Sequence, residues 1–65
     1  MQDAEFRFYK HNRKKFLRLY ENKYLLISGE KLLGIYDSHV TAYNDAILTL
    51  EVGAFIIRHP EHGEQ

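Results

Sequence analysis

The sequence contains no cysteine and only one proline. The absence of cysteine excludes disulfides, thiolate nucleophiles, and zinc or iron–sulfur sites built on cysteine. Small secreted domains usually depend on such cross-links, so a reducing compartment fits best and we expect a cytoplasmic protein. No apolar run approaches the ~20 residues that span a bilayer, and the acidic start of the chain is unlike a signal peptide. We therefore expect neither membrane insertion nor export.

The chain is short but rich in apolar residues. Its 65 residues are 45% hydrophobic and include five Tyr and four Phe. This composition differs from that of disordered segments, which bury too little apolar surface to offset chain entropy. A domain of this size buries only about 60% of the surface of its unfolded chain, so we expect a free energy of unfolding of roughly 3–10 kcal/mol. Without repeats or Gly/Ser-rich linkers, the sequence predicts one domain over residues 1–59 and a polar tail over residues 60–65.

Residues 5–20 are predicted to form the first helix. The apolar residues that recur there at helical spacing are Phe6, Tyr9, Phe16, Leu17 and Tyr20. Arg13 falls inside this apolar arc, where its alkyl stem could pack while its guanidinium reaches solvent. Asn12 is a good N-cap residue, so a second arrangement stays open, in which an extended or single-turn segment precedes a shorter helix over residues 13–20.

Two short apolar runs, residues 24–28 and 31–36, are joined by Gly29 and Glu30. A two-residue loop with glycine first supplies the positive φ that a type II′ turn requires, so this segment predicts a β-hairpin. Asp37 and Ser38 then offer helix caps before a second helix, whose apolar stripe is Val40, Tyr43, Ile47 and Leu50, with Ala42 and Ala46 beside it. Gly53 ends this pattern, and residues 54–58 are predicted to form a third strand.

The predicted element order is α-β-β-α-β. A two-residue link makes the first two strands antiparallel, and the helix after the second strand allows a right-handed crossover to the third. Residues 24–27 are apolar on both faces of the predicted strand, as is expected of a central strand. The sequence therefore predicts a small two-layer α+β domain, in which helices pack on a three-stranded antiparallel sheet of strand order 2-1-3.

Both faces of the predicted sheet are apolar. If the two helices share one face, the other exposes a patch of roughly several hundred Å², which a homodimer packed sheet on sheet would cover. If the helices lie on opposite faces, the result is a closed three-layer monomer. The predicted interface residues on the sheet are Tyr24, Leu26, Leu32, Tyr36 and Ile56.

The first part of the chain is basic, since residues 1–23 carry seven of the nine Lys and Arg residues against three acids. Arg7, Lys10, Lys14 and Arg18 follow helical spacing and predict one charged stripe beside the apolar arc. Such a stripe could bind an acidic protein, or nucleic-acid phosphates with the aromatic residues as stacking platforms. The pI of 6.9 argues against a dedicated nucleic-acid-binding protein, for which values above ~9 are usual.

Metal, catalytic and phosphate sites find little support. The segment His-Pro-Glu-His at 59–62 offers ligand types, but its proline keeps the histidines out of one helix and a metal would need further ligands. Residues 37–39, Asp-Ser-His, carry the groups of a hydrolytic triad, but three successive residues at a helix start point apart, and a helix cap explains them. Residues 29–34 contain two glycines in a strand-turn-strand context without a helix N-terminus. We expect no metal, no cofactor and no catalysis.

Several short motifs resemble those of a known family. They are Tyr-Glu-Asn-Lys-Tyr-Leu-Leu-Ile at 20–27, Leu-Gly-Ile-Tyr-Asp-Ser at 33–38, Ala-Tyr at 42–43 and Gly-Ala-Phe-Ile-Ile at 53–57. Over residues 6–58 the chain resembles a family of very small bacterial proteins classed as a domain of unknown function, with Ala54 in place of that family's threonine and Arg58 in place of a polar residue. The resemblance implies no activity and no catalytic residue. Some members are encoded near retroviral-type aspartic proteases, so it implies such a protease as a candidate partner.

The function that these observations favour is a small non-enzymatic interaction module. It would act through self-association as a homodimer or through a protein partner. The alternative is a weak nucleic-acid-binding accessory protein that uses the basic first helix, and an enzyme is the third choice.

Overall fold

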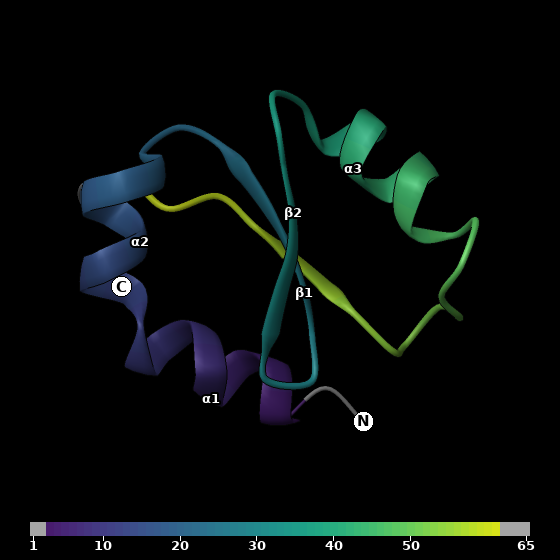
Figure 1. Ribbon diagram of the computed structural model, residues 1–65, viewed down its shortest axis with the longest axis horizontal. Helices are drawn as coiled ribbons and strands as arrows, with labels where there is room; N and C mark the ends of the chain where they lie inside the picture. The colour runs from purple at the N-terminus through teal and green to yellow at the C-terminus, as the bar shows by residue number, and fades with distance from the viewer. Residues whose placement is uncertain (1–2, 62–65) are drawn as a thin grey trace.

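The computed structural model describes residues 3–61 and has an α+β fold (Figure 1). Its elements in chain order are α1 (Asp3–His11), α2 (Arg13–Tyr20), β1 (Tyr24–Ser28), β2 (Lys31–Tyr36), α3 (His39–Ala46) and β3 (Ile56–Arg58). The three strands form one antiparallel sheet in the order β2-β1-β3. The predicted fold class and strand order are therefore confirmed.

The predicted first helix is in fact two helices that run in different directions, with Asn12 between them (Figure 1). Asn12 has φ −105° and ψ 11°, and its side-chain amide donates a hydrogen bond to the Phe8 carbonyl oxygen at 3.0 Å. Asparagine breaks helices in this way because its side chain competes for backbone groups. The prediction of one helix over residues 5–20 is wrong. The alternative boundary at Arg13 is right, although Asn12 makes no side-chain cap and a helix precedes it.

The hairpin forms as predicted, with Ser28 opposite Lys31 across a two-residue loop. Gly29 has φ +62° and Glu30 has no positive φ, which is the pattern of a type II′ turn. The register shifts between Leu26 and Ile27, so that Leu33 is an extra residue in β2. The turn is also attached to α1, because the Gly29 N–H donates a hydrogen bond to the buried Glu5 carboxylate at 2.6 Å.

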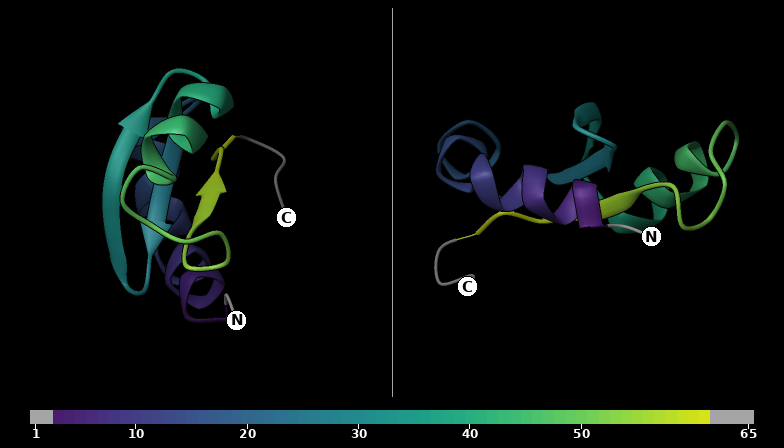
Figure 2. Two further views of the ribbon diagram at one scale, coloured as in Figure 1. Left: turned by 90° about the vertical axis from the view of Figure 1, so that its right-hand side faces the viewer. Right: turned by 90° about the horizontal axis from the view of Figure 1, so that it is seen from below.

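Helices cover both faces of the sheet, so the domain has three layers and not the predicted two (Figures 1 and 2). On one face α1 and α2 pack over a cluster of buried residues, which consists of Tyr9, Phe16, Leu25, Ile27 and Ile56. On the other face α3 packs over a smaller cluster, which consists of Leu26, Ala46 and Phe55. This is the three-layer arrangement that the sequence left open.

The connection from β2 through α3 to β3 begins as predicted but differs from the prediction after the helix. Ser38 caps α3, since its hydroxyl oxygen accepts a hydrogen bond from the Thr41 N–H at 3.1 Å, but the helix ends at Ala46 and turns follow. β3 begins at Ile56, two residues later than predicted. Pro60, which the prediction assigned to the polar tail, is fully buried, and its carbonyl oxygen accepts a hydrogen bond from the Asn22 N–H at 3.1 Å. Residues 62–65 lie outside the described residues.

Candidate interaction surfaces

The four residues of the predicted basic stripe, Arg7, Lys10, Lys14 and Arg18, are all exposed. Arg7 and Lys10 belong to α1, however, and the other two to α2, so the turn at Asn12 divides the stripe between two helix directions. The aromatic residues of these helices mainly face the core. Tyr9 and Phe16 are buried, and Phe8 and Tyr20 pack against them. The basic surface therefore lacks most of the stacking platforms that nucleic-acid binding would need.

The predicted interface residues on the sheet do not share one face. Tyr24, Leu26 and Tyr36 lie on the face that α3 covers. Leu32 and Ile56 lie on the face under α1 and α2, because the extra residue Leu33 reverses the alternation along β2. Leu26 and Ile56 are buried inside the domain. Since helices cover both faces, the face on which the sheet-on-sheet dimer depended is not free.

A different apolar surface lies on α3 and the loop that follows it. It consists of Val40, Tyr43, Ile47, Leu48 and Val52, and we call it the α3 apolar surface. Val40 is 66% exposed, Leu48 78% and Val52 76%. The helix turns Ala42 and Ala46 toward the sheet instead, so Val40, Tyr43 and Ile47 of the stripe identified in the sequence lie on its outer side. Leu50, the last residue of that stripe, packs against the cluster under α3. Two small residues allow the helix backbone to approach the sheet, and the larger side chains are left outside.

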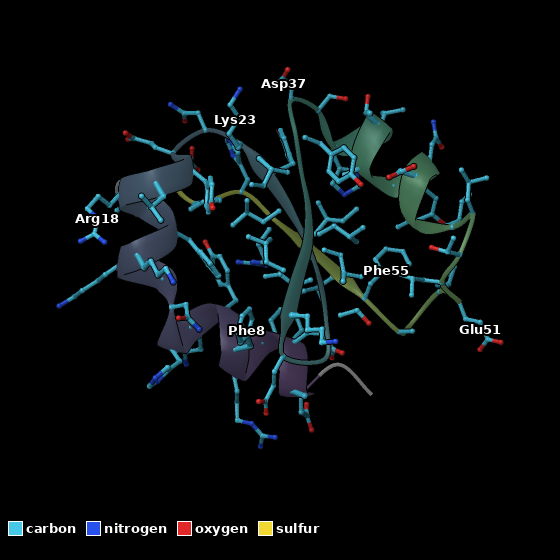
Figure 3. All side chains as sticks on the ribbon, viewed as in Figure 1. Phe8, Arg18, Lys23, Asp37, Glu51 and Phe55 are labelled. Carbon is cyan, nitrogen blue, oxygen red and sulfur yellow. The ribbon has the colours of Figure 1, made fainter. Side chains whose placement is uncertain are left out.

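The chain segment that carries the α3 apolar surface holds carboxylates but no lysine or arginine, although Asp37, which precedes the helix, forms an exposed ion pair with Lys23. Residues 32–57 contain no lysine and no arginine, while Asp37, Asp45 and Glu51 lie within this range and are all exposed. The basic helices lie at the opposite end of the molecule (Figure 1). Although the net charge is zero, the charges are unevenly distributed: the end formed by α1 and α2 is basic, and the end formed by α3 is acidic and apolar. Figure 3 shows this division in the labelled residues, with Arg18 at one end and Glu51 at the other.

Two histidines pack against tyrosine rings where β1, β3 and α3 meet. The His59 ring stacks on Tyr24 with centroids 4.4 Å apart, and Tyr24 meets the His39 ring edge to face at 6.1 Å. His39 in turn stacks on Tyr43 at 6.5 Å. His59 is thus part of the folded domain, whereas its suggested metal partner His62 lies outside the described residues. Among residues 3–61, no group of three potential metal ligands comes together.

Tyr36 lies across Gly34, two residues earlier on the same strand. A Cβ atom at Gly34 would come within 2.6 Å of the Tyr36 hydroxyl oxygen. That hydroxyl donates a hydrogen bond to the Asp45 carboxylate on α3. The hydrogen bond, with smaller effects from burial and from the charge of Asp45, raises the pKa of Tyr36 above its ordinary value of 10.0. This contact joins β2 to α3 and gives a structural reason for the glycine.

The part of the chain that the structure describes offers no other kind of site. No pocket is found over residues 3–61, and none of the three helices described there is long and apolar enough to cross a lipid bilayer. No family model, curated protein or solved structure matches the chain. The family resemblance of the sequence motifs therefore stays a prediction.

Proposed function

We propose that this protein is a small non-enzymatic interaction module, and that the α3 apolar surface is the site at which it binds a protein partner. The observation that carries the proposal is the exposure of Val40, Leu48 and Val52, each about two-thirds or more accessible in a domain that has very little core. Isolated exposed apolar residues are ordinary, but several on one helix and its following loop are typical of protein-binding surfaces.

The charges beside this surface specify the chemistry of the partner. The exposed carboxylates of Asp45 and Glu51 have no lysine or arginine near them in sequence between residues 32 and 57. A complementary partner presents apolar side chains bordered by lysine or arginine, because such a border matches the acidic rim and accelerates encounter. An amphipathic helix with a basic border has this pattern.

A peptide library displayed on phage tests the proposal even though the natural partner is unidentified. Selection on the immobilised full chain should enrich peptides that combine apolar residues with lysine or arginine. The variant Leu48→Lys places a cation on the surface at a highly exposed position and should preserve the melting temperature while weakening the selected peptides by about tenfold or more. Lys15→Glu, at an exposed position of α2, is the matched control and should bind them as the wild type does.

The same two variants distinguish the proposed binding of a protein partner from the alternative, binding of nucleic acid by the basic helices. A labelled single-stranded oligonucleotide should bind weakly or not at all, and its binding should not depend on Leu48. If the oligonucleotide binds with a steep salt dependence that Lys15→Glu reduces, and the selected peptides bind Leu48→Lys as tightly as wild type, the basic helices are the functional surface and the proposal is wrong.

A further inference from the structure

The outward side of α2 carries three cations and a leucine. Its exposed residues, Lys14, Lys15, Arg18 and Leu19, recur at helical spacing and share one side of the helix, opposite the buried Phe16. Leu19 is 51% exposed, and Figure 3 shows Arg18 pointing away from the rest of the molecule. Among residues 3–61, no ion pair engages Lys14, Lys15 or Arg18. We call these four residues the α2 basic face.

The α2 basic face has the chemistry that the proposed function requires of a partner, an exposed apolar side chain bordered by lysine and arginine. The alkyl stems of lysine and arginine cover apolar surface while their charged ends stay in water. Laid over Leu48 and Val52 of the α3 apolar surface, such a face would bring its cations toward the exposed carboxylates of Asp45 and Glu51. The two surfaces are therefore complementary in charge and in apolar character.

The α2 basic face and the α3 apolar surface cannot meet within one molecule. α2 and α3 pack on opposite faces of the sheet and lie at opposite ends of the domain (Figures 1 and 2). Contact between the two surfaces therefore needs a second molecule, and every copy of the chain carries both of them. Because the net charge is zero, two copies also lack the overall repulsion that keeps charged proteins apart.

We infer that the partner of the α3 apolar surface is the α2 basic face of a second copy of this chain. The inference rests on the proposed function, because it identifies the partner of that same surface. The contact joins two different surfaces, so each pair keeps one free α2 basic face and one free α3 apolar surface, to which further copies can add. It thus differs from the homodimer that the sequence suggested, in which one surface meets its own copy.

Light scattering with the full chain, from low micromolar to near-millimolar concentration, tests this inference. The wild-type mass should rise from 7.7 kDa past twice that value as concentration increases, and added salt should lower it. Leu48→Lys and Lys15→Glu each change one of the two surfaces at an exposed position, and each should weaken self-association by about tenfold or more. A wild-type mass that stays at 7.7 kDa over the whole range would overturn the inference.

An equal mixture of these two variants tests whether the contact joins different surfaces. Leu48→Lys keeps its α2 basic face and Lys15→Glu keeps its α3 apolar surface, so the mixture should form pairs, and nothing larger, at concentrations where each variant alone is monomeric. As a control, the double variant replaces Lys15→Glu. It has neither surface intact and should not pair with Leu48→Lys, although their net charges are opposite in sign. If the mixture of single variants is no heavier than its components, the inference is wrong.

The peptides selected on the α3 apolar surface separate failure of this inference from failure of the proposed function. Lys15→Glu should self-associate weakly yet bind those peptides as the wild type does. Peptides that require Leu48, together with a wild type that stays monomeric, would overturn this inference and leave the proposed function standing. Peptides that bind Leu48→Lys as tightly as the wild type would overturn the proposed function, and this inference with it.

Discussion

The contact between Gly34 and Tyr36 predicts that Gly34→Ala changes the stability of the domain in opposite directions with and without the Tyr36 side chain. An added Cβ at Gly34 would lie 2.6–2.8 Å from three atoms at the end of the Tyr36 side chain. Gly34 does not have a positive φ, so Gly34→Ala introduces no backbone strain. The tyrosine ring must instead swing away from the strand, and its hydroxyl then loses the Asp45 carboxylate.

The size of the effect follows from two opposing terms. A buried hydrogen bond to a charged group contributes about 1.5–3 kcal/mol to stability. The bond between Tyr36 and Asp45 is exposed, so we expect its loss, together with the lost packing of the ring, to cost about 1–2 kcal/mol. Alanine recovers about 0.5–1 kcal/mol relative to glycine in a strand. Gly34→Ala should therefore destabilise the wild type by about 0.5–1 kcal/mol, whereas in a Tyr36→Ala background it should stabilise by a similar amount.

Urea unfolding of the four proteins in this double-mutant cycle measures the coupling directly. We expect a coupling energy of about 1–2 kcal/mol, well above the ~0.5 kcal/mol within which independent substitutions usually add. Tyr36→Phe serves as a further control, because it keeps the ring over Gly34 and removes only the hydroxyl. If Gly34→Ala has the same effect with and without the Tyr36 ring, the described contact does not exist in solution.

Four further predictions concern the cap, the hairpin turn, the buried carboxylate and pH. Ser38→Ala should cost about 1 kcal/mol in thermal unfolding, while Asp37→Ala, which loses only an exposed ion pair, should cost clearly less. Gly29→Val should cost roughly 1–3 kcal/mol from its positive φ, and an unchanged melting temperature would exclude the type II′ turn. Glu5→Ala should cost about 1–3 kcal/mol in urea unfolding, because it leaves the Gly29 N–H without its acceptor. The raised pKa of Tyr36 means that its contribution is complete below pH 10.0 and is lost as pH rises through the folded-state value, so Tyr36→Phe should reduce the loss of stability at alkaline pH.

Local signals in the sequence were sufficient for the hairpin and the strand order. Gly29 could be interpreted directly, since a two-residue loop with glycine first has few conformations, and the double-sided apolar pattern of β1 indicated a central strand. The break at Asn12 was harder to predict, because the residue's side chain competes with the backbone without any glycine or proline to mark the site. Helix periodicity continues across the break, so the pattern alone favoured one helix.

The distribution of helices over the two faces could not be obtained from the pattern of the sheet, which is apolar on both sides. The small residues of α3 were the neglected signal: Ala42 and Ala46 are buried, while the larger residues of the stripe, such as Val40 and Ile47, are exposed. The bulge at Leu33 could not be predicted from the sequence pattern either. Because of this extra residue, the β2 residues before it point to the face opposite to the one that regular alternation predicts. The predicted interface therefore combined residues of both faces, and the α3 apolar surface was missed.

The position of β1 between two separate clusters has a consequence for cooperativity. Its consecutive residues alternate between them, with Leu25 and Ile27 in the cluster under α1 and α2 and Leu26 in the cluster under α3. β1 is also hydrogen-bonded on both sides, to β2 and to β3. Loss of either helical layer exposes one cluster, but opening β1 exposes both, so its amide protons should exchange with solvent only through global unfolding. The central strand thus makes two small cores, neither large enough to be stable alone, unfold as one unit.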